Sequence, residues 1–171
     1  MNLFGILKPK NINTTLMEEH THTIGRVHSG IKTLENLSID LKNISKVDFV
    51  ELGEEFSSKG GRFKRYAKSL VRTELEMFNE IELIEFESGE TNVFFKAPVS
   101  NVKIGNLSKL VESFHHEFGE DMFGNTSFDN YDENSIKRSF WTGRYWNKNA
   151  PRISIKLMND CLELSVLGLR K

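Results

Sequence analysis

The fold class is decided by the stretch RISIKLM-ND-CLELSV, residues 152–166. On both sides of Asn159-Asp160, apolar side chains alternate with polar ones, and this period of two is typical of strands with one buried face. Asn and Asp also favour the left-handed backbone that a tight hairpin turn requires. The stretch therefore predicts an antiparallel hairpin with strands at about 152–158 and 161–169. A further strand is expected before it, at about 137–146.

A helix and a second hairpin are predicted upstream. Apolar residues recur at three- and four-residue spacing over 107–118, between Asn106 as the N-cap and Gly119 as the stop. Residues 74–83 follow a period of two, with a slip at Leu83-Ile84 that suggests a bulge, and a single long helix ending near Asn79 is the alternative. A turn at 88–91 and a strand at 92–97 complete the hairpin. The C-terminal half is thus predicted to be a ββαβββ unit.

The N-terminal half is predicted to add one strand and two helices. Strict alternation over 36–42 predicts the strand. Ser45 has the properties of an N-cap for a short helix over about 46–56, and apolar spacing predicts a second helix over 62–73. Residues 1–30 are expected to form an irregular segment that packs on or beside the rest, and 120–135 a polar loop. Together these elements predict a single α+β domain, 1–171, with a mostly antiparallel sheet and helices packed on one face.

Composition limits the classes of function. The chain has 171 residues, with 23 basic and 24 acidic side chains and a net charge of −1. That balance argues against a protein that binds nucleic acid over its whole surface. The single cysteine excludes an internal disulfide framework and fits a reducing compartment, so a cytoplasmic location is expected. No apolar run approaches the ~18 residues of a membrane span, the first residues lack the order of a secretory signal, and no cofactor-binding fingerprint is found.

Basic and acidic residues are unevenly distributed between residues 59 and 90. Residues 59–72 contain six bases and no acid, whereas 74–90 contain seven glutamates and no base. If the basic segment is a helix, its like charges repel one another and its first bases oppose the helix dipole. Either the two segments pack together and neutralise each other, or one of them meets a charged partner. The candidate basic face consists of Arg62, Lys64, Arg65, Lys68 and Arg72, and the acidic candidates for protein contact are Glu82 and Glu85.

The predicted strand around residue 144 supplies a second candidate surface. The segment from Phe140 to Trp146 carries aromatic residues on both faces, whereas only one face of a helix-backed sheet is core. Tryptophan, tyrosine and arginine dominate the energetics of many protein interfaces. The candidates for contact with a protein partner are therefore Trp141, Arg144, Tyr145 and Trp146, with burial of both faces as the alternative.

Few residues could support catalysis or metal binding. His20 and His22 form a usable ligand pair on an extended segment, but no third ligand stands at a typical zinc spacing. His115 and Glu117, on the helix predicted over 107–118, would complete an acid/base or metal set with them. Cys161 has no base beside it in the sequence, so it is expected to be structural rather than nucleophilic.

From these features we predict three functions, in order of preference. The first is a small intracellular binding protein that acts through protein–protein contact, such as an inhibitor or an immunity-type protein that neutralises a charged partner. The second is a nucleic-acid-associated module that uses the basic face within 59–72. The third is a small metal-dependent enzyme that uses the histidines. No motif in the chain identifies a family.

Overall fold

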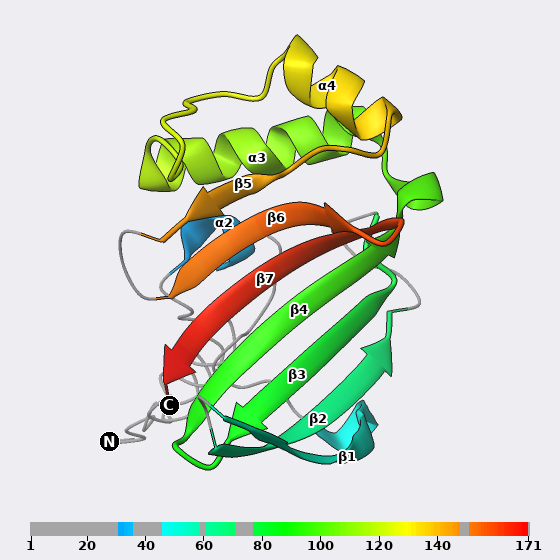
Figure 1. The fold of residues 1–171 in the computed structure, drawn as a ribbon, viewed down its shortest axis with the longest axis vertical. Helices are drawn as coiled ribbons and strands as arrows, with labels where there is room; N and C mark the ends of the chain where they lie inside the picture. The colour runs from blue at the N-terminus through cyan, green and yellow to red at the C-terminus, as the bar shows by residue number, and fades with distance from the viewer. Residues whose placement is uncertain (1–30, 36–45, 59–60, 71–76, 148–150, 171) are drawn as a thin grey trace, which may run out of the picture.

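The computed structural model describes residues 31–35, 46–58, 61–70, 77–147 and 151–170. Their strands form one seven-stranded sheet in the order β1-β2-β3-β4-β7-β6-β5, and all neighbouring strands are antiparallel (Figure 1). In these ranges no helix has the length and apolar character needed to cross a bilayer. In chain order the elements are α2 (Lys32–Glu35), η1 (Lys46–Asp48), β1 (Val50–Ser57), β2 (Gly61–Ser69), β3 (Glu80–Phe86), β4 (Glu90–Pro98), η2 (Val99–Asn101), α3 (Ile104–Phe118), α4 (Asn130–Lys137), β5 (Arg144–Trp146), β6 (Arg152–Met158) and β7 (Cys161–Arg170).

The C-terminal hairpin is confirmed. β6 joins β7 through Asn159 and Asp160, whose φ angles are 49° and 61°. These two residue types tolerate the left-handed conformation better than most others. On its other edge β7 pairs with β4, so β7 joins the strands β5 and β6 to the strands β1 to β4. The strand predicted at 92–97 is confirmed as part of β4.

The hydrophobic core lies on one face of the sheet, which we call the covered face. The strand registers align Ile81 with Phe95, Phe95 with Leu164, and Leu164 with Ile155, and all four side chains are buried. α3 packs over this face with its apolar stripe, which consists of Leu107, Leu110, Val111 and Phe114. The opposite face, which we call the polar face, carries Arg65, Glu82, Lys96, Glu163 and Lys156, because side chains alternate along each strand.

The helix predicted over 107–118 is confirmed, but its start is different. α3 begins at Ile104 and ends at Phe118, and it is followed by Gly119 as the C-cap, whose φ of 78° suits glycine. The amides of Asn106 and Leu107 both donate to the carbonyl of Lys103, at 2.9 and 3.1 Å. Asn106 therefore lies inside the first turn and is not the N-cap. The position before the helix has no side-chain cap, which is why the start has no signal in the sequence.

The helices predicted over 46–56 and 62–73 are wrong. Residues 46–48 form only a short 3-10 turn, and the rest of both segments that the structure describes forms the hairpin of β1 and β2, up to Ser69. Apolar residues at Phe63, Tyr66 and Ala67 suit a helix by spacing alone. In the sheet, β2 lies between two strands that carry acidic residues, and this tertiary pairing overrides the helical spacing of the apolar residues. The predicted N-cap Ser45 lies outside the described residues.

The strand predicted over 74–83 is confirmed from Glu80 onward. Residues 71–76 lie outside the described part, and Met77–Asn79 is not helical. β3 keeps one register with both neighbours from Glu80 through Glu85, so the bulge predicted at Leu83-Ile84 is wrong. The register shifts occur instead in β1, between Glu51 and Gly53, and in β4, between Thr91 and Val93. The predicted strand 36–42 and the segment 1–30 also lie outside the described residues.

The region between α3 and β6 differs most from prediction in the C-terminal half. The expected strand 137–146 is reduced to the three residues of β5, and the expected loop 120–135 contains the start of α4. Asp129 caps α4 in a reciprocal capping box with Asp132. The order from β3 is therefore β3-β4-α3-α4-β5-β6-β7, so the predicted ββαβββ unit is not confirmed, whereas the mixed α+β class with an antiparallel sheet is.

Candidate protein-binding surface

The charges that the sequence separates come together in the sheet. β2 carries the bases and lies between β1 and β3, which carry glutamates. Each described base of β2 has an acidic neighbour: the ion pairs are Arg62–Glu54 (3.7 Å), Lys64–Glu51 (3.6 Å), Arg65–Glu55 (3.0 Å), Arg65–Glu82 (2.7 Å) and Lys68–Asp48 (2.9 Å). Arg72 lies outside the described residues. The neighbouring strands and η1 therefore neutralise the part of the candidate basic face that the structure describes.

Glu82 is the buried member of this network. Its carboxylate accepts hydrogen bonds from Arg65 Nε, at 2.7 Å, and from Lys96 Nζ. Burial raises the pKa of Glu82, but the hydrogen bonds from the two cations outweigh burial and leave the pKa below its ordinary value. Hydrogen bonds to Glu82 and Glu55 raise the pKa of Arg65, and the bond to Glu82 raises that of Lys96 despite burial. Glu82 is thus engaged within the chain, and Glu85 pairs with Lys46.

Most of the candidate aromatic surface is buried. Trp141, Arg144 and Trp146 are between 3% and 5% exposed. The Trp146 ring packs on Phe114 of α3, with 5.3 Å between ring centroids. Tyr145, which alternates to the polar face, is half-buried. As the chain is folded here, Tyr145 is the member of this set with an accessible side chain.

Arg144 is held between two buried carboxylates from different segments. Its Nη2 donates to Asp132 of α4, and its Nε lies 3.7 Å from Asp121 Oδ2 in the loop after α3. Trp141 Nε1 donates to the other oxygen of Asp132 at 2.6 Å. Such a network holds its members in one arrangement, because each buried charge needs its partners. It therefore ties β5, α4 and the loop together.

Asp121 organises that loop. Its Oδ1 accepts hydrogen bonds from the backbone amides of Phe123 and Asn125, both at 2.9 Å, and the Asn125 side chain donates to both carboxylate oxygens. The amide of Met122 donates to the carbonyl of Tyr145 at 2.7 Å, which attaches the loop to β5. The backbone of residues 121–125 is therefore anchored through a buried carboxylate and a strand.

The anchored loop presents large apolar side chains to solvent. Met122 is 55% exposed and Phe123 is 62% exposed. The Phe123 ring stands edge-on to the Tyr145 ring, with 5.8 Å between centroids and an angle of 89° between the planes. We call Met122, Phe123 and Tyr145 the loop–strand surface. It combines an aromatic pair and a methionine on a backbone that is held in place, which suits contact with a protein.

The candidates for catalysis that the structure describes make structural contacts or are partly buried. His115 is buried, with Nδ1 3.1 Å from the carbonyl oxygen of Gly119 and its ring edge-on to Trp146. The Glu117 carboxylate accepts hydrogen bonds from the first two backbone amides of α2, at 2.6 and 2.8 Å. Burial raises the pKa of the Cys161 thiol, which disfavours the reactive thiolate.

No group of three histidine, cysteine, aspartate or glutamate side chains within the described ranges is arranged to hold a metal ion. His20 and His22 lie outside those ranges, so the candidate ligand pair is not placed relative to His115 or Glu117.

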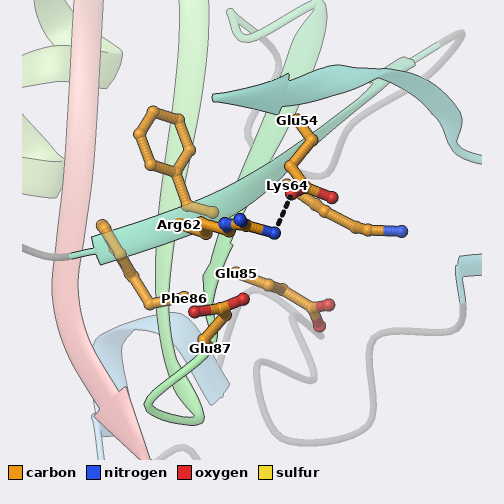
Figure 2. A pocket seen from close by; sticks show the side chains of 7 residues that line it. Glu54, Arg62, Lys64, Glu85, Phe86 and Glu87 are labelled. Atoms are coloured by element: carbon orange, nitrogen blue, oxygen red, sulfur yellow. Dashed lines mark ion pairs between the residues drawn. The ribbon is translucent and has the colours of Figure 1, made fainter. Parts of the chain in front are cut away.

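A shallow pocket of about 190 Å³ lies at the end of the β1–β2–β3 sheet region (Figure 2). The Phe63 and Phe86 rings, 5.5 Å apart, form part of its wall. Charged side chains form the rest, and the Arg62–Glu54 ion pair crosses one side. The charged part of its lining combines three glutamates with Arg62 and Lys64, so its chemistry does not favour a ligand of either charge. The full lining is Glu54, Arg62, Phe63, Lys64, Glu85, Phe86 and Glu87.

No protein-family model, curated protein or solved structure compared with this chain matches it. The function is therefore argued from the chemistry of its surfaces.

Sequence reasoning missed the residues that build the loop–strand surface. It predicted a polar loop over 120–135, whereas the carboxylates of Asp121 and Asp132 in that segment are buried against Arg144. One local signal was present: Asp121 precedes Asn125 by four residues around Gly124, a composition that favours side-chain-to-backbone turns. Nothing local indicated that Met122 and Phe123 would be exposed.

Proposed function

We propose that this chain is a binding protein that acts through protein–protein contact, with the loop–strand surface as its contact site. The observation that supports it is the combination of exposed Met122 and Phe123 side chains with a backbone anchored through Asp121. A preorganised loop loses less conformational entropy on binding than a flexible one. Methionine and aromatic side chains are enriched at protein interfaces.

Within that class, we favour an inhibitor or immunity-type protein. Such a protein covers one partner tightly, and a small chain achieves this best with apolar anchors on a rigid support. The buried Arg144 network supplies the support. Trp141, Arg144 and Trp146 then act behind the surface as positioning residues, and Tyr145 contributes to the surface itself.

The nucleic-acid alternative has less support. Arg62, Lys64, Arg65 and Lys68 each have an acidic neighbour within the chain, so a phosphate backbone would compete with existing ion pairs. The metal-dependent alternative lacks a described ligand group.

The test uses the full chain as bait for affinity capture from native lysate, followed by binding measurements with the captured partner. In the test variant, Met122→Ser/Phe123→Ser removes the apolar tips. In the control variant, Tyr131→Ser/Met158→Ser removes two side chains that are also exposed but lie elsewhere. We expect the test variant to weaken binding at least ~10-fold, as loss of interface anchors does, and the control to remain within ~2-fold. Equal binding by both variants would reject the loop–strand surface as the contact site.

A further inference from the structure

β1 is an exposed strand at the edge of the sheet. It is the terminal strand next to β2, and none of its eight residues is buried. Val50, Leu52 and Phe56 are 66%, 53% and 75% exposed. From Val50 to Phe56, the ladder that β1 forms with other described strands is the one with β2. Its outer edge therefore offers N–H and C=O groups to an added strand.

The composition of β1 differs from that of a protected edge. Edge strands usually carry lysine, proline or inward-pointing charges that block pairing with another chain. β1 has three large apolar residues and three glutamates, with neither lysine nor proline. The bulge between Glu51 and Gly53 is a protective device, but a regular stretch of pairing follows it from Gly53 to Ser57. This stretch is long enough for a short ladder.

The glutamates determine which charge an added strand should carry. The carboxylates of Glu51 and Glu54 lie 3.6 and 3.7 Å from bases of β2, beyond hydrogen-bond distance, and both side chains are about half exposed. They can therefore accept a second cation from the outer side, in competition with the long ion pairs to Arg62 and Lys64. A second copy of the chain suits the edge poorly when β1 pairs with itself about Glu54, because antiparallel pairing then sets that glutamate opposite its copy.

We propose that β1 binds an extended, basic peptide segment of a partner protein as an additional strand of the sheet. The Lys or Arg side chains of that segment lie beside Glu51 and Glu54, which the register places on the same face as Phe56. Apolar side chains alternate with the bases and lie beside Val50 on the other face. Main-chain hydrogen bonds supply affinity and the alternating side chains supply selectivity. This surface is at the opposite edge of the sheet from β5 and is independent of the loop–strand surface (Figure 1).

The probe is a short, end-blocked peptide of alternating lysine and valine with a fluorescent label, titrated with the full chain and followed by anisotropy. One control peptide has glutamate in place of lysine. A second keeps lysine and valine but is N-methylated at alternate residues, so that one edge cannot form the ladder. We expect saturable binding of the first peptide and at least ~10-fold weaker binding of both controls.

Two variants of the chain complete the test. Glu54→Lys reverses the charge beside the proposed strand, and Glu120→Lys makes the same change of charge in the loop after α3. Circular dichroism checks that both remain folded. We expect Glu54→Lys to weaken binding of the basic peptide ~10-fold and Glu120→Lys to leave it within ~2-fold.

Three results would overturn the proposal. Equal binding of the N-methylated peptide would show charge attraction without strand addition. Protection from hydrogen exchange of those β1 amides that point away from β2, in the free chain, would show that this chain already covers the edge. A dimer in sedimentation that Phe56→Lys dissociates would show that a second copy occupies it.

Discussion

Substitution of Arg144 by methionine is the sharpest test of how the candidate surface is held. Arg144→Met keeps most of the side-chain volume but removes the cation between Asp121 and Asp132. Both aspartates are almost completely buried, at 2% and 0% exposed. Breaking a buried ion pair by removing one partner costs about 3–5 kcal/mol, because the remaining charge stays desolvated. We expect Arg144→Met to lower the free energy of unfolding by that amount, because two buried carboxylates lose their cation.

Asp132→Asn serves as the graded comparison. The amide oxygen can still accept the Trp141 Nε1 hydrogen bond, and Arg144 retains Asp121 at 3.7 Å. The change removes the acceptor of two hydrogen bonds, the charge-assisted one from Arg144 Nη2 and the capping-box one from the Asp129 amide at 3.0 Å, so we expect a loss of about 1–3 kcal/mol. Against a total stability of about 5–15 kcal/mol for a domain, the two variants should be clearly separated from each other and from the wild type.

The assay is urea unfolding followed by fluorescence of Trp141 and Trp146, which both lie in or beside the network. The control is Arg152→Met, an exposed arginine of β6, for which we expect a change within about 0.5 kcal/mol. A loss below about 1 kcal/mol in Arg144→Met, with an unchanged denaturant slope, would refute the reasoning. It would mean that the network does not hold the loop after α3 in place.

Three further changes probe other parts of the molecule. Glu82→Gln should lower stability at pH 7 by about 2 kcal/mol, since it removes an anion bonded to two cations. The pKa of Glu82 is lower in the folded chain than in the unfolded chain, so its contribution to stability is present above the unfolded pKa and is lost as the pH falls through the folded pKa. Below pH ~4.5 the stability of the wild type should therefore depend more steeply on pH than that of Glu82→Gln. Gly143→Ala should destabilise the chain by at least about 2 kcal/mol in thermal unfolding, because φ is 95° and a Cβ would stand 2.2 Å from the Ile155 carbonyl oxygen. The matched control Gly105→Ala, in α3 with no atom beyond the local helix backbone within 4 Å of the added Cβ, should be neutral or stabilising. Cys161 should react with iodoacetamide more slowly than a free thiol at neutral pH, because burial raises its pKa; a faster reaction would contradict the assignment of an unreactive cysteine.

Local patterns predicted the elements whose partners are close in sequence. The hairpin around Asn159-Asp160 carries both alternation and turn residues, and the helix ending at Gly119 carries an unbroken apolar stripe. The segments 46–56 and 62–73 lacked such agreement between signals. Their apolar spacing suited a helix, whereas their charges suited strands beside oppositely charged neighbours.

The candidate surface was predicted only in part for the same reason. The sequence pointed to the aromatic segment from Trp141 to Trp146, and its tyrosine does reach the surface. Its tryptophans and arginine instead face α3 and α4, because β5 is covered on that side. Burial of Arg144 depends on two aspartates that are 12 and 23 positions away in the chain. No local rule selects them from the other acidic residues of the same loop.

The sequence by itself determined the α+β class, the C-terminal hairpin and the main helix, because each depends on the period of apolar residues along a few turns or one strand pair. The tertiary structure decided where the charges go. It placed the basic strand β2 between acidic neighbours and Arg144 between buried carboxylates. Charge neutralisation and burial depend on which segments become neighbours in space, and that is a property of the whole sheet rather than of any segment.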